Sequence, residues 1–195
     1  MSFTDRSRTH DQAPPIEVEL LSRSAGADAT LMERISELTN EVYAVAEAGL
    51  WTDGAIRTTV GEIVERTRAG QIAVARMGGQ VVGCVRVQRL DERTGEFGML
   101  CADPAHRGIG IGRELIRFVE RKSHGDGMST MQLELLVPRD WTHPTKQFLA
   151  EWYSRIGYRI ARSGTIDELY PELAPRLATP CDFVIYRKEL TRWAP

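Results

Sequence analysis

Apolar positions along the chain alternate between short strand-like runs and stripes at helical spacing. The first run, residues 16–21, predicts a strand. Thr30 and Glu33 have the spacing of a capping box, which predicts that a helix begins there. Gly49 is expected to end this helix. The apolar stripe of the helix consists of Leu31, Ile35, Leu38, Val42 and Val45.

A second helix and a hairpin are predicted next. Thr59 and Glu62 form another capping box, and the short helix that it opens should stop at Gly70. Residues 71–76 and 80–88 are apolar runs separated by Gly78-Gly79. Two glycines suit the two-residue turn of a hairpin, so these runs predict paired antiparallel strands.

The middle of the chain has the pattern of a strand–helix–strand unit. Residues 96–102 predict a strand, an Asp-Pro break and a glycine cluster follow, and residues 113–122 form an amphipathic helix. Residues 131–137 predict the next strand, so the unit should be a right-handed parallel crossover. Within the helix, Ile111, Leu115 and Val119 should face the sheet, and Arg113, Arg117 and Arg121 should face solvent.

The last third adds one helix and two strands. Pro144 suits the first turn of a helix that Gly157 should end. Residues 158–161 and 182–188 predict the closing strands, with a proline-rich segment, 165–180, between them. The apolar face of the helix is expected to contain Phe148, Leu149, Trp152 and Ile156.

These elements predict one α/β domain, a mixed sheet with helices on both faces. We expect the domain to span residues 16–190, after a disordered leader at 1–15 and before a short tail at 191–195. A length of 195 residues suits a single domain.

Composition excludes several classes of partner and site. A net charge of -2 provides no global attraction to nucleic acid or to an anionic membrane. No apolar run approaches the ~20 residues of a membrane helix, and the N-terminus lacks the apolar core of a signal peptide. The three cysteines have no metal-binding spacing. We therefore expect a cytoplasmic protein with reduced thiols and no metal.

The glycine cluster is the strongest chemical signal in the sequence. Glycines between a strand and a helix leave backbone N–H groups free at a helix N-terminus, where they bind phosphate. A P-loop is excluded because Arg113-Glu114 follows the last glycine, and the G-x-G-x-G spacing fits a dinucleotide fingerprint poorly. A glycine-rich turn without a ligand remains open. The pattern Arg/Gln-x-x-Gly-x-Gly/Ala fits Arg107, Gly110 and Gly112 without a gap.

With this loop, the chain resembles the GNAT superfamily of acyl-CoA-dependent N-acetyltransferases. A second family motif, Tyr-x-x-x-Gly-Phe/Tyr, is present as Tyr153 to Tyr158. The resemblance implies a mostly antiparallel seven-stranded sheet whose fourth and fifth strands splay apart where the cofactor enters. It also implies acetyl-CoA as the acyl donor and direct transfer of the acetyl group to a primary amine.

The resemblance further implies which residues bind coenzyme A. The pantetheine arm would contact the backbone of the signature strand, and the pyrophosphate would contact N–H groups from Gly108 to Arg113. Many relatives have an asparagine after the fifth strand, which this chain lacks; Lys146 or Trp141 are the candidates to replace it. The full predicted set is Leu100, Cys101, Ala102, Arg107, Gly108, Ile109, Gly110, Ile111, Gly112 and Arg113, with the side chains of Ile109 and Ile111 mainly packing.

Acetyl transfer to an amine needs a base and an acid. With a lysine-like pKa, only about one amine in 2,500 is unprotonated at neutral pH. The resemblance implies Tyr153 as the acid for the leaving thiolate and Glu96 as the base. Glu134, an ionisable residue in an apolar strand, is the alternative base. Tyr153 is otherwise a core residue, although Trp152 is the better core candidate, and Glu96 is otherwise a surface residue.

Two further alternatives stay open at this stage. Cys101 and His106 are candidates for a covalent nucleophile–base pair. Glu47, Trp51 and Asp53 offer two carboxylates and an aromatic ring to an ammonium group, which weakly favours a small amine as acceptor. For any one of these residues, a helix C-terminus followed by a capped turn is the simpler explanation. Competing functions are a protein N-terminal or lysine acetyltransferase and a non-catalytic acyl-CoA sensor. The oligomeric state is open between a monomer and a homodimer.

Overall fold

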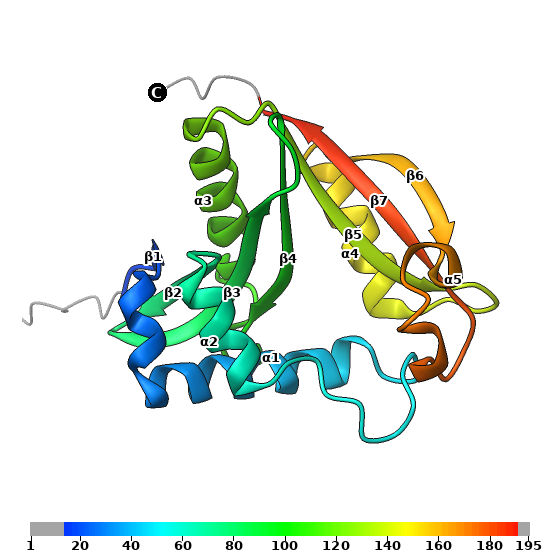
Figure 1. Ribbon diagram of the computed structural model, residues 1–195, viewed down its shortest axis with the longest axis horizontal. Helices are drawn as coiled ribbons and strands as arrows, with labels where there is room; N and C mark the ends of the chain where they lie inside the picture. Colours follow the sequence, from blue (N-terminus) through cyan, green and yellow to red (C-terminus); the bar gives the residue numbers. More distant parts are fainter. Residues whose placement is uncertain (1–13, 191–195) are drawn as a thin grey trace, which may run out of the picture.

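A computed structural model describes residues 14–190. It contains one seven-stranded sheet in the order β1-β2-β3-β4-β5-β7-β6 (Figure 1). Every ladder is antiparallel except that between β4 and β5, so the predicted mixed sheet is confirmed. The predicted tail and most of the leader lie outside the described residues. The strands are β1 (Glu17–Leu20), β2 (Ile72–Met77), β3 (Gln80–Arg89), β4 (Thr94–Ala102), β5 (Thr130–Pro138), β6 (Arg159–Thr165) and β7 (Cys181–Glu189).

Helices cover both faces of the sheet, as the sequence predicts (Figure 1). Residues of α1 and α2 share one core cluster with β2–β4, and residues of α3 and α4 share another with the opposite face. The helices are α1 (Ala29–Ala46), α2 (Val60–Arg68), α3 (Ile111–Gly125), α4 (Pro144–Arg155) and α5 (Ile166–Leu169), with 3₁₀ turns η1 (Arg23–Ala27), η2 (Pro104–His106) and η3 (Ala174–Arg176).

Helix starts show how local chemistry sets these boundaries. The predicted capping box opens α2, where Thr59 and Glu62 exchange both of their hydrogen bonds. The box predicted at Thr30 is wrong, because Asp28 caps α1 two residues earlier by accepting from the Leu31 amide at 3.0 Å. Val45 is also not a core residue, with 73% of its surface exposed, since the cluster that α1 covers reaches only to Val42 and Tyr43.

The sheet opens between β4 and β5. These strands pair only from Thr94 to Glu96 with Thr130 to Gln132. Immediately afterwards β4 contains a bulge, because Arg86 pairs with Gly98 but Cys84 pairs with Cys101, which leaves one extra residue on β4. Met99 in the bulge has the left-handed φ of 51°. The bulge turns β4 away from β5, so the predicted splay of the fourth and fifth strands is confirmed (Figure 1).

Helix α4 packs through the predicted face except at Phe148. Phe148 is 53% exposed, whereas Leu149, Trp152 and Ile156 contact the core cluster and Tyr153 lies inside it. The prediction also ranked Trp152 above Tyr153 as a core residue, and the structure reverses that order. The reason is that the helix rests on the open half of the sheet with Tyr153, not Phe148, pointing inward.

The segment predicted as a proline-rich connection contains further structure. Strand β6 continues to Thr165, whose side chain then caps the short helix α5. The 3₁₀ turn η3 follows, and Leu177 forms a β-bridge with Trp51 of the α1–α2 loop. Two segments more than a hundred residues apart in sequence are thereby joined, and they wall a cavity described below.

Candidate active site

The glycine loop before α3 has the geometry of an anion site. Gly108 and Gly110 have φ angles of 87° and 99°, which residues with side chains rarely adopt. A Cβ at either position would meet no atom within 4 Å, so open space lies beside the backbone. Gly110 is the N-cap of α3, whose first N–H groups have no partner within the helix. These N–H groups and the helix dipole favour a negatively charged ligand.

The loop is held at both sides by the fold. Asp103 accepts from the Ala105 amide at 2.9 Å and lies 3.3 Å from Arg34 of α1. On the other side, a Cβ at Gly112 would lie 3.3 Å from the Trp152 ring, so this glycine lets α4 approach the start of α3. These contacts fix the position of the loop relative to α1 and α4.

Side chains around the loop differ in part from the prediction. Ile111 is buried against the sheet, as expected of a packing residue. Ile109 is 47% exposed, so its predicted packing role is wrong: the residue lies between two left-handed glycines, away from the sheet. Arg107 and Arg113 are exposed beside the loop.

The part of β4 beyond the bulge is the predicted contact for the pantetheine arm. Leu100, Cys101 and Ala102 lie where β4 is no longer paired with β5. The Cys101 thiol is buried beside Cys84, at 3.1 Å, and Thr39, at 3.7 Å. No hydrogen bond joins Cys101 to His106, which lies beside Asp103 on the loop. The structure thus does not assemble the alternative nucleophile–base pair.

A cavity of about 150 Å³ occupies the opening between β4 and β5. It brings together the three residues that the sequence singled out as catalytic. Glu96 lines it from β4, Glu134 from β5 and Tyr153 from α4. The splay therefore creates a space where two carboxyl groups and a phenol face one ligand.

Glu96 is buried, which excludes the alternative that it is a solvent-exposed surface residue. It is 6% exposed, and its Oε1 accepts from the Arg86 guanidinium at 2.8 Å and from the Gln88 amide at 3.0 Å. Both partners lie on β3, where Gln88 is directly opposite Glu96 and Arg86 is opposite Gly98. These two donors hold the carboxylate in place and compensate for its burial.

Glu134 has a different environment. The Tyr170 hydroxyl donates to its Oε2 at 2.6 Å, and no salt bridge to Glu134 is found within residues 14–190. Burial raises the pKa of the Glu134 carboxyl, the nearby charge of Glu96 adds to this, and the Tyr170 hydrogen bond opposes it. A carboxylate with a raised pKa is a stronger base than an ordinary glutamate.

Tyr153 lines the same cavity from α4. It is 6% exposed and packs among the rings of Phe97, Trp152, Tyr158 and Tyr186. Burial raises the pKa of its phenol, so the hydroxyl stays protonated across the ordinary pH range. Tyr158, the second aromatic residue of the motif, instead donates to buried Glu120 at 2.7 Å. The two motif tyrosines thus differ, because only Tyr153 lines the cavity.

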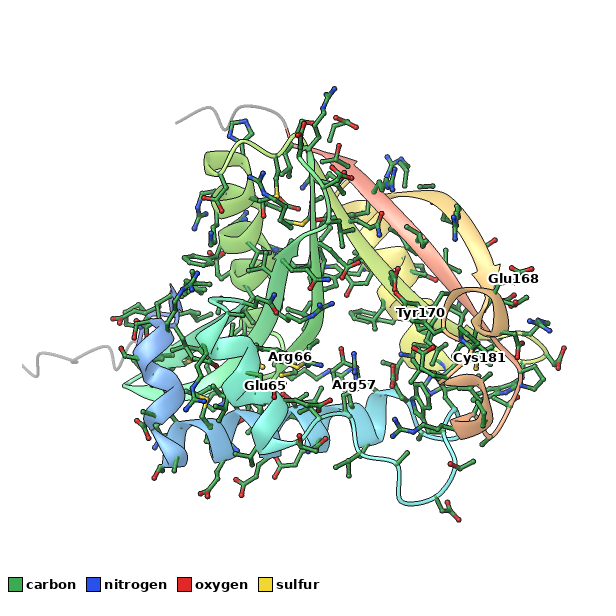
Figure 2. The ribbon with its side chains drawn as sticks, in the orientation of Figure 1. Arg57, Glu65, Arg66, Glu168, Tyr170 and Cys181 are labelled. Atoms are coloured by element: carbon green, nitrogen blue, oxygen red, sulfur yellow. The ribbon has the colours of Figure 1, made fainter. Side chains whose placement is uncertain are left out.

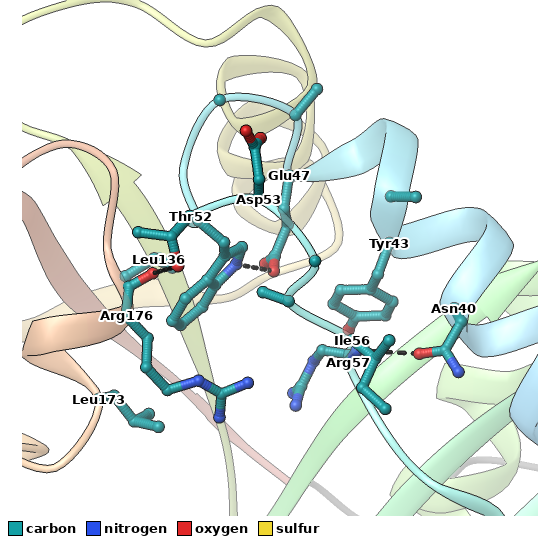
Figure 3. A pocket seen from close by; sticks show the side chains of 16 residues that line it. Asn40, Tyr43, Glu47, Thr52, Asp53, Ile56, Arg57, Leu136, Leu173 and Arg176 are labelled. Carbon is teal, nitrogen blue, oxygen red and sulfur yellow. Dashed lines mark hydrogen bonds between the residues drawn. The ribbon is translucent and has the colours of Figure 1, made fainter.

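A second cavity, of about 410 Å³, adjoins the first and shares Tyr43, Glu47, Arg57 and Leu136 with it (Figure 3). Its walls are the end of α1, the α1–α2 loop and the segment around η3. Figure 2 labels Arg57 and Tyr170, which border the opening from the α1–α2 side and from the α5 side. Glu96 and Glu134 line only the smaller cavity, so a small molecule that extends from one cavity into the other would reach them.

The structure corrects the predicted role of Glu47. Its Oε1 pairs with buried Lys146 at 2.6 Å and its Oε2 accepts from the Trp51 indole at 2.7 Å. Both oxygens are thus committed to neighbouring side chains, and Glu47 is not available to hold an ammonium group. Lys146 also lines the smaller cavity, and its contact with the pantetheine arm stays a prediction.

The sequence prediction missed several residues of the site. Arg86 and Gln88 stand at alternate positions of an apolar strand opposite Glu96, so strand alternation was a usable signal for both. Tyr170 and Arg176 lie in a segment without periodicity, and only the three-dimensional fold brings them to the site.

Within the described residues, no group of three or more His, Cys, Asp or Glu side chains is arranged to hold a metal ion. No helix in residues 14–190 is long and apolar enough to cross a membrane.

Comparison with known families identifies the loop and the fold together. Residues 68–160 match the family model for the acetyltransferase (GNAT) domain. These matched residues belong to the GNAT superfamily. The matched region contains the glycine loop, the bulged strand and Tyr153. It omits α1, most of α2 and the segment around η3, so the larger cavity is built mainly from parts of the chain outside the GNAT match.

Solved GNAT structures share the fold at low sequence identity. An aminoglycoside 6'-N-acetyltransferase complexed with coenzyme A has a TM-score of 0.67 and 14% identity, covering 92% of this chain and 99% of that one. A putative acetyltransferase from Salmonella typhimurium with its cofactor acetyl-CoA has a TM-score of 0.63 and 17% identity, covering 93% and 97%.

The likeness also includes part of a larger enzyme. The N-acetylglutamate synthase of Neisseria gonorrhoeae, complexed with coenzyme A and N-acetyl-glutamate, has a TM-score of 0.62 and 15% identity. The match covers 91% of this chain but only 36% of the synthase chain. No curated protein sequence matches this chain significantly. These likenesses establish the GNAT fold, and the acceptor has to be inferred from the site.

Proposed function

We propose that this protein is an acyl-CoA-dependent N-acetyltransferase that transfers an acetyl group directly to the primary amine of a small molecule. One observation carries the proposal: the open glycine loop at the start of α3 directly follows β4, and β4 lines the cavity that contains Glu96, Glu134 and Tyr153. Acetyl-CoA has a pyrophosphate for the first feature and a thioester for the second. The coenzyme A complexes of the GNAT neighbours support this assignment.

The donor substrate would be bound mainly by the backbone. Its pyrophosphate would accept from N–H groups between Gly108 and Arg113, with Arg107 nearby. The pantetheine arm would follow Leu100, Cys101 and Ala102, where β4 has lost its parallel partner. This path leads from the loop to the cavity in the splay.

Glu134 is better suited than Glu96 to act as the base for the acceptor amine. It would take a proton from the ammonium group, directly or through water, and the amine nitrogen would then attack the thioester carbonyl. The raised pKa of Glu134 suits this task, and its Oε1 has no hydrogen-bond partner among the described residues. Glu96, with two donors on one oxygen, would orient the amine.

Tyr153 would provide the proton for the leaving group. When the tetrahedral intermediate collapses, the C–S bond breaks and the thiolate takes a proton from the phenol. The phenolate would regain a proton from the amine nitrogen, which loses its extra proton as the amide forms. The raised phenol pKa makes this transfer uphill, so Tyr153 would act by its position beside the sulfur rather than by acid strength.

The pH dependence of activity distinguishes the two carboxylates. Glu134→Gln should lower kcat/KM by about 10²-fold or more, because the variant lacks the proton acceptor. Since a base works only when deprotonated, wild-type activity should fall as pH drops through the Glu134 pKa, which lies above the ordinary value of ~4.3. The Glu134→Gln variant should lose this inflection, and a kcat/KM profile against pH measures it.

Glu96→Gln serves as the matched comparison. It should lower activity while the acid-side inflection of the pH profile persists. If instead Glu96→Gln removes the inflection and Glu134→Gln keeps it, the base assignment is reversed.

Two other functions would fit the fold. A non-catalytic acyl-CoA sensor would bind coenzyme A without turnover, and a protein acetyltransferase would prefer a peptide amine. Release of the coenzyme A thiol with an amine panel separates the enzyme from the sensor. The adjoining cavity, closed on one side by the η3 segment, supports a small acceptor over a peptide.

A further inference from the structure

Two arginines from distant segments line the larger cavity. Arg57 comes from the α1–α2 loop and Arg176 from the end of η3. Figure 3 shows their guanidinium groups reaching from opposite walls toward the same part of the cavity. Within residues 14–190, neither guanidinium forms a salt bridge with a carboxylate.

Arg57 is positioned by its neighbours. Asn40 accepts from the backbone amide of Arg57 at 2.9 Å and from that of Thr58 at 3.1 Å. The guanidinium carbon of Arg57 lies 4.9 Å from the centre of the Tyr43 ring, which supports the charge from one side. Because Arg57 lines both cavities, its charge lies at the junction between the acceptor space and the reactive carboxylates.

Arg176 is fixed through its backbone. Its carbonyl accepts from the Thr52 amide at 2.9 Å and from the Thr52 hydroxyl at 3.2 Å. The bridge between Trp51 and Leu177 continues this contact. These bonds hold the end of η3 against the α1–α2 loop, so Arg176 faces the cavity from the wall opposite Arg57.

The acidic residues of this cavity do not neutralise the two arginines. Glu47 is paired with Lys146. Asp53 also lines the cavity, but Figure 3 shows its carboxylate pointing away from both guanidinium groups. Beyond Arg57, the neighbouring cavity has Arg86 paired with Glu96. The space between Arg57 and Arg176 is thus positively charged and suits a planar anion such as a carboxylate.

We propose that the acceptor amine carries a carboxylate, which Arg57 and Arg176 bind while the amine reaches Glu96 and Glu134. This inference rests on the proposed function and specifies its substrate class as small amino-acid-like amines. A cavity of about 410 Å³ has room for such a molecule. A simple alkylamine would bring no carboxylate to either guanidinium group.

Matched acceptor pairs test the proposal. Amino acids and their carboxamides differ mainly in the anionic group, and the carboxamides have the more readily deprotonated amine, which biases the comparison against the proposal. Wild-type protein should prefer the carboxylate member by roughly tenfold or more in kcat/KM. Arg57→Gln and Arg176→Gln should each remove most of this preference through a higher KM for the carboxylate, with KM for acetyl-CoA unchanged.

Arg23→Gln is the control, because Arg23 is exposed on η1 at the opposite end of α1 and loses the same charge. It should keep the wild-type preference. A preference that is absent in the wild type, or equal in all three variants, would overturn the proposal.

A binding measurement separates this inference from the proposed function. Glutarate should raise the melting temperature of the wild type and of Arg23→Gln, but not that of Arg57→Gln or Arg176→Gln. If no amine is acetylated while glutarate behaves in this way, the proposed function fails and the anion site stands. If amines are acetylated without carboxylate preference and glutarate has no effect, the anion site is wrong and the proposed function stands.

Discussion

A Gly110→Asp variant should lose coenzyme A binding while keeping its fold. Gly110 is the N-cap of α3 with a φ of 99°, and a Cβ there would meet no atom within 4 Å. The new side chain would therefore fit, but it would place a carboxylate where the pyrophosphate is expected. Aspartate is also among the residues that best tolerate a left-handed backbone.

Thermal unfolding measures the effect. Coenzyme A at about 100 times its Kd should stabilise the wild type by ~2.7 kcal/mol, which corresponds to roughly 5–10 °C in a chain of this size. Dephosphorylated pantetheine should stabilise it much less, because it lacks the pyrophosphate. Gly110→Asp should show almost no shift with either ligand.

Gly127→Asp is the matched control for backbone strain. Gly127 follows α3 at its other end, has a φ of 88° and also has no atom within 4 Å of its Cβ position. This variant should lose a similar amount of intrinsic stability but keep the full shift with coenzyme A. Retained affinity in Gly110→Asp, or equal stabilisation of the wild type by pantetheine, would show that the pyrophosphate lies elsewhere.

A Tyr153→Phe variant should lose on the order of 10²-fold or more in kcat. The ring would stay packed among its aromatic neighbours, and no hydrogen bond of the Tyr153 hydroxyl is found within residues 14–190, so stability should barely change. The loss should shrink for an acyl donor with a more acidic thiol, because that thiolate departs without a proton. Measuring kcat with both donors, beside a melting curve, tests the role of the hydroxyl.

Tyr186→Phe is the control from the same aromatic cluster. Tyr186 is 4% exposed, and its ring centre lies 6.3 Å from that of Tyr153, but it does not line the cavity. Its variant should keep kcat near the wild-type value with both donors. If Tyr153→Phe behaves like Tyr186→Phe, then Tyr153 is a core residue and not the acid.

Features with a local cause could be predicted from the sequence. The glycine loop, the hairpin turn at Gly78-Gly79 and the capping box at Thr59 depend on a few neighbouring residues, and the structure has all three. The start of α1 was harder to predict, because Asp28 and Thr30 are both residues that can cap a helix, and Asp28 is the one that does so. The splay came from the resemblance, but its physical basis, an extra residue in β4 opposite β3, has no sequence signal of its own.

The acceptor side could not be predicted because its residues meet only in the folded chain. Arg57 lies in the α1–α2 loop and Arg176 in η3, and neither segment has an apolar periodicity. These two segments come into contact only in the folded chain. Glu47 was misjudged for the same reason, since Lys146, its partner, is 99 positions away. Composition showed these charged residues but not their pairing.

The most direct test of the account measures release of the coenzyme A thiol from acetyl-CoA in the presence of a panel of small amines. An acetyltransferase should show release that depends on the amine, an acetylated amine detected by mass spectrometry, and loss of both in Glu134→Gln and Tyr153→Phe. The opposite result would be binding of coenzyme A with no amine-dependent release for any member of the panel. That result would contradict an acetyltransferase and favour a protein that only binds acyl-CoA.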